Sequence, residues 1–76
     1  VGSDTIAFEH LPPHAGHSVL PVHRVLLVEN AINIVEALSL EELAAARVHE
    51  FLVVLNPLNI LGATGAPIRP RAIVPE

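Results

Sequence analysis

Prolines divide this 76-residue chain into short segments. Three prolines and a glycine fall between His10 and Pro21, and this density excludes regular structure, so we expect a loop there. Glu50 to Leu55 is a continuous apolar run that ends before Asn56 and Pro57. It predicts a strand with both faces covered, which would lie centrally in a sheet.

The first helix is expected directly after the loop. Pro21 is tolerated in a first helical turn, and apolar residues recur on one helical face of Val22–Glu29. This pattern predicts a helix of about two turns. Asn30 is expected in the left-handed conformation that ends such a helix.

A strand and a second helix are expected next. Ile32–Leu38 is rich in β-branched residues and predicts a strand. Ser39 and Glu42 have the spacing of a capping box, and we expect a helix from there through Ala46. Extended pieces are also expected at residues 6–9, 58–61 and 72–74. The order of these elements indicates an α/β fold with a mixed sheet and two short helices.

The composition is very apolar for a small domain, with 51% hydrophobic residues and a mean hydropathy of +0.55. A chain of this length buries only about 60% of the surface that it exposes when unfolded. We therefore expect much of its surface to face other protein, in a homo-oligomer. With no cysteine, any metal would be held by His, Asp or Glu.

Charge and hydropathy exclude two classes of partner. The formal charge is −4 with only four basic residues, which argues against nucleic-acid binding. No apolar run approaches the roughly 20 residues that span a bilayer, and the first residues lack a signal-peptide pattern. A soluble, cytoplasmic protein with no membrane association is the expectation.

Glu36 and His23 are the residues most suited to chemistry. In a strand, Glu36 would share a face with Ile32 and Ile34, where a charge needs a metal ion, an arginine or a protonated neighbour. His23 would lie in the first helical turn, from which a helix–strand reversal brings it beside Glu36. Imidazole is the commonest metal ligand, although the residues alone favour a hydrogen bond from His23 to the loop over a metal.

The other histidines carry less information. His10, His14 and His17 fall in the proline-rich loop, where no helix aligns them, and are expected in solvent. His49 is expected near a helix end, where imidazole interacts favourably with the helix dipole. Gly62-Ala63-Thr64-Gly65 is interpreted first as a turn.

Four segments in order resemble the C-terminal portion of the cyclase and kynurenine formamidase family of metal-dependent hydrolases. They are Val1-Gly2-Ser3-Asp4-Thr5, His23-Arg24-Val25-Leu26-Leu27, Ile34-Val35-Glu36 and the nine residues from Gly62 to Pro70. The resemblance implies a swivelling β/β/α domain, oligomeric assembly, and a site with one or two divalent ions, zinc or manganese. Metal-activated water there attacks a small-molecule amide, formamide or lactam. The family's C-terminal His and Glu ligands match His23 and Glu36.

The family's His-Gly-Thr-His-x-Asp-x-Pro-x-His motif, which supplies most of the metal ligands, is not among these residues. Residues 1–76 are therefore expected to form the C-terminal portion of a single cyclase-family domain. Activity would require the missing N-terminal region or a partner chain. The alternative is a non-catalytic assembly or binding module in which Glu36 pairs with Arg69 or Arg71. A third, weaker hypothesis is a stand-alone small-ligand domain.

Overall fold

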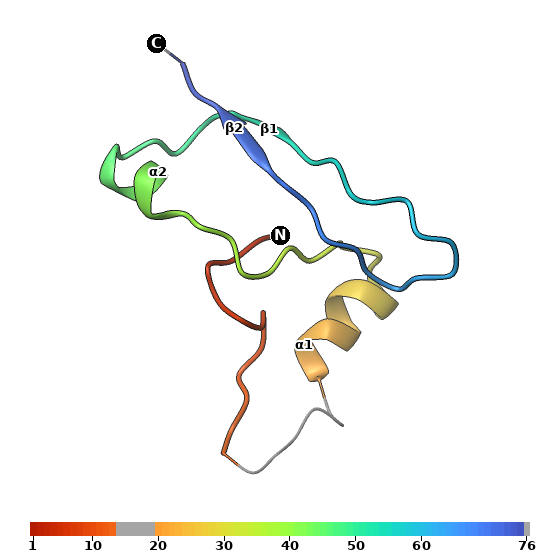
Figure 1. Ribbon diagram of the computed structural model, residues 1–76. Helices are drawn as coiled ribbons and strands as arrows, with labels where there is room; N and C mark the ends of the chain where they lie inside the picture. The colour runs from red at the N-terminus through yellow and green to blue at the C-terminus, as the bar shows by residue number, and fades with distance from the viewer. Residues whose placement is uncertain (14–19, 76) are drawn as a thin grey trace. The chain divides into compact units, whose positions relative to one another are not determined.

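A computed structural model describes residues 1–13 and 20–75 of the chain (Figure 1). Its elements are, in order, α1 (Pro21–His23), the π-helical η1 (Arg24–Glu29), α2 (Glu41–Ala45), β1 (Leu52–Val54) and β2 (Arg71–Ile73). Short helices and an antiparallel two-stranded sheet make this a small mixed α/β structure, the class that the sequence predicts. The chain divides into two compact units, Val1–Glu41 and Glu42–Glu76.

In the first unit, α1 runs into η1 without a break, because Arg24 keeps right-handed helical angles. Pro21 begins this helix as expected. Its end differs from the prediction. Asn30 has φ −125° and is not left-handed, whereas Ala31 has φ 53°. The Asn30 side-chain amide nitrogen donates to the Val25 carbonyl at 2.7 Å, which ties the residue after the helix to its last turn.

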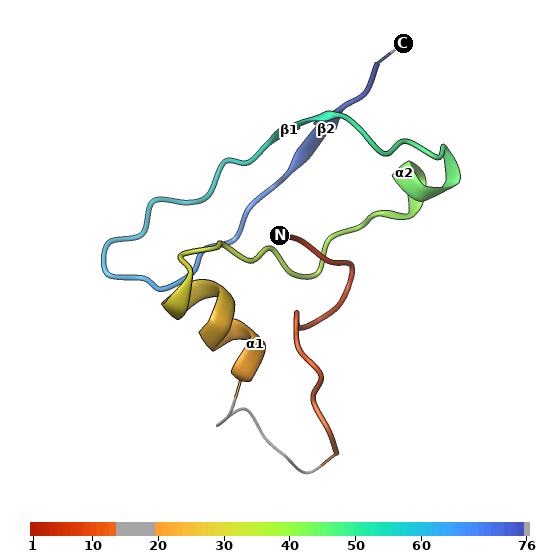
Figure 2. The same cartoon turned by 180° about the vertical axis from the view of Figure 1, so that it is seen from behind.

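The predicted strand over Ile32–Leu38 is reduced to one parallel bridge between Gly2 and Val35. Residues 1–5 run beside residues 33–38, as both views of the cartoon show (Figures 1 and 2). Ser3 N donates to Val35 O at 3.0 Å and Leu38 N donates to Ser3 O at 3.0 Å. The ladder stops because Ala37 takes φ 54°, a left-handed angle that turns the chain out of the strand.

Helix α2 lies close to its predicted range, but the capping box does not form within the described residues. The hydrogen bond at its start joins Leu40 N to Asp4 Oδ2 at 3.2 Å, and the helix begins at Glu41. Arg47, with φ 54°, follows its last turn. Asp4 thus accepts from the residue before the helix, a donor other than the Glu42 N–H that was expected to bond to Ser39.

In the second unit, β1 pairs with β2 in a register that sets Val53 opposite Ala72. The predicted central strand is therefore an edge strand, because the sheet built by the described residues has two strands. The relative exposures of Leu52, Val53 and Val54 are 63%, 50% and 43%, so the expected coverage of both faces is wrong for this chain by itself. Residues 6–9 and 58–61, expected as extended pieces, lie outside the strands.

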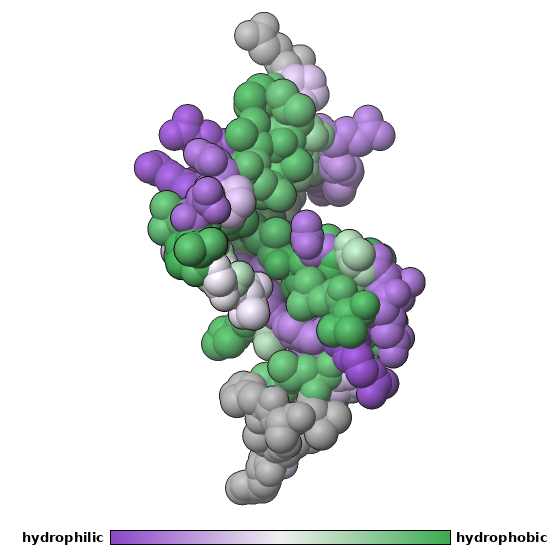
Figure 3. Space-filling model, turned by 90° about the vertical axis from the view of Figure 1, so that its right-hand side faces the viewer, coloured by the Kyte–Doolittle hydropathy of each residue, from purple (hydrophilic) through white to green (hydrophobic). Residues whose placement is uncertain are grey.

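None of the described residues is buried, and many large apolar side chains are exposed. Hydrophobic surface is plain on the face shown in Figure 3. Within the described part of the chain, no helix is long and apolar enough to cross a membrane. The contacts around His23, in the first unit, form the candidate functional site.

Candidate functional site

The His23 ring lies between two carboxylates. Its Nε2 atom is 2.8 Å from Glu36 Oε1, and its Nδ1 atom is 3.1 Å from Glu9 Oε2. The structure thus brings together the two residues that the sequence singled out, although thirteen positions separate them. The helical end at Asn30 and Ala31 reverses the chain between them.

The N-terminal segment also contacts the Glu36 carboxylate, at the oxygen atom that faces His23. The Phe8 backbone N–H donates to Glu36 Oε1 at 2.9 Å. The pairing of residues 1–5 with residues 33–38 brings these two parts of the chain together. The Glu36 side chain keeps 32% of its surface exposed, so the carboxylate is anchored yet open to solvent.

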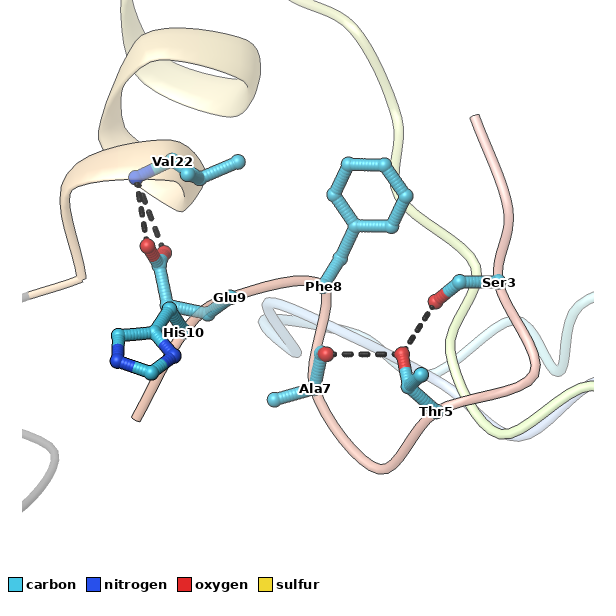
Figure 4. Close-up of a pocket in the computed structure, with 7 residues that line it drawn as sticks. All are labelled: Ser3, Thr5, Ala7, Phe8, Glu9, His10 and Val22. Carbon is cyan, nitrogen blue, oxygen red and sulfur yellow. Dashed lines mark hydrogen bonds between the residues drawn. The ribbon is translucent and has the colours of Figure 1, made fainter. Parts of the chain in front are cut away.

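Glu9 is the functional candidate that the sequence analysis missed. Its side chain is only 1% exposed. The carboxylate accepts hydrogen bonds from Val22 N at 3.1 and 3.0 Å and from His23 N at 3.0 Å (Figure 4 shows the Val22 bonds). It therefore satisfies backbone donors of the first helical turn, which have no partner within the helix.

A signal for Glu9 exists in the sequence, but it is indirect. Leu20 precedes the helix and makes no side-chain capping bond. A helix whose preceding residue is apolar needs an acceptor from elsewhere. Neither sequence separation nor pattern indicates which acidic residue of the chain provides it.

The two carboxylates perturb the ionisation of the site. The hydrogen bond to Glu9 raises the pKa of His23; desolvation opposes this effect, and the attraction of Glu36 reinforces it. Desolvation raises the pKa of Glu9, but the hydrogen bonds from His23 and Val22 outweigh it and leave this pKa below its usual range. The arrangement favours an imidazolium ring flanked by carboxylates.

The contact between His23 and Glu36 requires a positive species. A neutral ring nitrogen without hydrogen and a carboxylate oxygen are both acceptors, so they repel each other at 2.8 Å. A proton on Nε2 removes this repulsion in the metal-free site. A divalent cation bound by both atoms would remove it as well, since imidazole nitrogen and carboxylate oxygen are common zinc ligands.

The other described histidines do not join this site. His10 and His49 are exposed, and His49 lies beyond the end of α2, whereas His14 and His17 lie outside the described residues. In residues 1–13 and 20–75, no group of three or more His, Asp or Glu side chains is arranged to hold a metal ion. The described residues therefore offer His23 and Glu36 only as a pair of candidate ligands.

Beside Glu9 lies an open depression, shown in Figure 4. It is lined by Ser3, Thr5, Ala7, Phe8, Glu9, His10 and Val22. Its hydroxyl groups are already engaged, because Ser3 Oγ and Thr5 Oγ1 are 2.7 Å apart and Thr5 Oγ1 donates to Ala7 O at 2.9 Å. The depression therefore offers few free polar groups.

Comparison of the chain with protein-family models, curated proteins and solved structures gave no match. Functional assignment therefore depends on the geometry around His23 and on the resemblance carried by the four sequence segments. These two lines of argument use different observations. Both single out His23 and Glu36.

Proposed function

We propose that this chain contributes His23 and Glu36 as two ligands of a zinc or manganese site in a hydrolase of the cyclase and kynurenine formamidase type. The observation that carries this proposal is the 2.8 Å approach of His23 Nε2 to Glu36 Oε1. An imidazole nitrogen and a carboxylate oxygen suit either metal. The resemblance to the family supports the same pair of residues.

Each residue has a definite part in this proposal. His23 donates the Nε2 lone pair, and Glu36 contributes negative charge that offsets the charge of the cation. The Phe8 N–H holds the Glu36 carboxylate in place while leaving it partly open to solvent. A divalent ion bound there supplies polarisation of a carbonyl group and a water molecule of lowered pKa.

The other ligands and the general base come, in this proposal, from an N-terminal region of the same domain or from a partner chain. The elements described here are then part of a swivelling β/β/α domain, and residues 1–76 alone are inactive. The substrate is a small molecule with an amide, formamide or lactam bond. Hydrolysis of that bond is the proposed activity.

A second candidate is a non-catalytic assembly or binding module derived from the same fold. The exposed apolar residues of β1 favour it, because such surface normally meets other protein. The direct pairing of His23 with Glu36 also satisfies both side chains without a metal. Metal content distinguishes the two candidates.

The test compares Glu36→Gln with Glu29→Gln in the full-length, assembled protein. Glu29 is a matched control, because it is an exposed glutamate that pairs with Arg24 at 3.5 Å, away from His23. We expect Glu36→Gln to lower zinc and manganese content, measured by elemental analysis, and hydrolysis of an aryl formamide together. Unchanged metal content in Glu36→Gln, or equal losses in both variants, would favour the non-catalytic module.

A further inference from the structure

Glu9 is a nearly buried carboxylate that the proposed metal site does not use as a ligand. We propose that Glu9 is a positioning residue, which holds the His23 ring through a hydrogen bond from Nδ1–H and so directs Nε2 toward Glu36 and the metal. The metal part of this inference rests on the proposed function. The orientation of the ring is a property of the metal-free chain.

One oxygen atom of Glu9 fixes both the backbone and the ring of His23. Glu9 Oε2 is 3.0 Å from His23 N and 3.1 Å from His23 Nδ1. Rotation of the ring away from Glu36 would break the bond at Nδ1 while the backbone stays in place. The ring is therefore held in the orientation that points Nε2 at Glu36 Oε1.

The same contact decides which ring nitrogen is available to a metal ion. Glu9 already accepts backbone N–H groups of Val22 and His23, which stabilise its ionised form, and an ionised carboxylate is only an acceptor. Nδ1 is therefore the donor to Glu9. Nε2 faces the Glu36 carboxylate, where a metal ion would take the place of the proton that this contact needs in the metal-free site.

Carboxylates that accept the second N–H of a ligating histidine commonly fix its tautomer and raise its basicity. Loss of such a partner costs about 10-fold to 100-fold in metal affinity. Glu9 has the geometry of this group. It reaches His23 from a segment 14 residues earlier and caps the helix with the same carboxylate.

The capping role has to be separated from the positioning role. Asn30→Ala is a matched control, because it removes the hydrogen bond to Val25 O at the other end of the helix and leaves the ring contacts intact. Glu9→Gln is the conservative variant. Its amide oxygen in the position of Oε2 keeps the acceptor for Nδ1 and His23 N, whereas Glu9→Ala removes every one of these contacts.

The experiment measures imidazole ¹⁵N shifts of His23 by NMR in the zinc-loaded full-length protein, with His23→Gln identifying the signals. We expect zinc on Nε2 and hydrogen on Nδ1 in wild type, Asn30→Ala and Glu9→Gln, and loss of this single arrangement in Glu9→Ala. Zinc titration should show about 10-fold to 100-fold weaker binding for Glu9→Ala than for Asn30→Ala. Glu9→Gln should restore most of that difference.

Zinc on Nδ1 in wild type, or an unchanged arrangement in Glu9→Ala, would overturn the positioning role. So would equal zinc affinity in Glu9→Ala and Asn30→Ala while Glu36→Gln binds zinc more weakly than wild type. Failure of the proposed function has a different signature. In that case zinc affinity would be the same in wild type and Glu36→Gln.

Discussion

At the scale of single residues, His23 combines two carboxylate contacts that act on opposite ring nitrogens. Glu9 is held by backbone N–H groups and has little freedom to move, while Glu36 is one-third exposed. The first contact orients the ring, and in the proposed metal site the second would supply charge opposite to that of the cation.

The raised pKa of His23 and the lowered pKa of Glu9 predict how stability depends on pH without metal. The His23 contribution is complete below its ordinary value of 6.5 and is lost as pH rises through the folded-state pKa. The Glu9 contribution is complete above its ordinary value of 4.5 and is lost as pH falls through the folded-state pKa. Together they contribute most between pH 4.5 and 6.5.

Urea unfolding of metal-free full-length protein at several pH values checks this prediction. The free-energy difference between wild type and His23→Gln should shrink as pH rises above the His23 pKa. The difference between wild type and Glu9→Gln should shrink as pH falls below 4.5. A wild-type advantage over His23→Gln that grows with rising pH would show that the ring is not stabilised as an imidazolium.

At the scale of elements, the helix over residues 21–29 depends on groups outside it at both ends. Glu9 accepts from its first turn, and Asn30 donates to a carbonyl of its last turns. Ala31 then carries the left-handed angle that was expected at Asn30. An alanine in this conformation is strained by about 1 to 2 kcal/mol, because its Cβ approaches the following carbonyl oxygen.

Ala31→Gly should therefore raise the free energy of unfolding by up to about 1 kcal/mol, since part of the relieved strain is offset by greater freedom of the unfolded chain. Ala44→Gly is the control, and its expected effect on the free energy of unfolding has the opposite sign. It lies inside α2 and should lower stability by about 1 kcal/mol. Thermal unfolding of both variants tests this, and a destabilised Ala31→Gly would contradict the strain at that position.

Local signals in the sequence predicted the helices better than the strands. Pro21 and the apolar periodicity identified the first helix, because both act within a few residues. The prediction of a strand over residues 32–38 was wrong, because the length of a strand there depends on a partner segment 33 positions away and on the φ angle of Ala37. The bond from Leu40 N to Asp4 was missed for the same reason, because acceptors distant in sequence leave no periodic pattern.

The candidate site was partly predictable for the same reason. The pairing of His23 with Glu36 follows from a short reversal between a helix and an extended segment. Glu9 was not predictable from spacing, because its role depends on how the segment before the proline-rich loop returns to the helix. The resemblance pointed to His23 and Glu36 as ligands, and the structure adds the Glu9 carboxylate beside the His23 ring.

At the scale of the whole molecule, the described residues expose more apolar surface than a free-standing small domain normally does. Leu52, Val53 and Val54 form an edge strand with side chains open to solvent. A bare apolar edge strand is a site for pairing with another chain. We therefore expect residues 1–76 in isolation to associate.

Light scattering of the isolated chain should give a mass well above its 8.1 kDa. Val53→Lys should reduce this association, because a charge on the edge strand opposes pairing. Glu29→Lys is a control on an exposed helical position. A wild-type chain that remains an 8.1 kDa monomer and unfolds cooperatively would instead support a stand-alone domain.

Anomalous diffraction at the zinc or manganese edge, from crystals of the full-length protein, tests the proposal that His23 and Glu36 bind one metal ion. We expect a single anomalous peak about 2.0 to 2.2 Å from both His23 Nε2 and a Glu36 carboxylate oxygen. Glu9 should remain on Nδ1 in that crystal. A fully loaded protein whose anomalous peaks all lie away from this pair, with His23 still bonded directly to Glu36, would show that the pair is not a metal site.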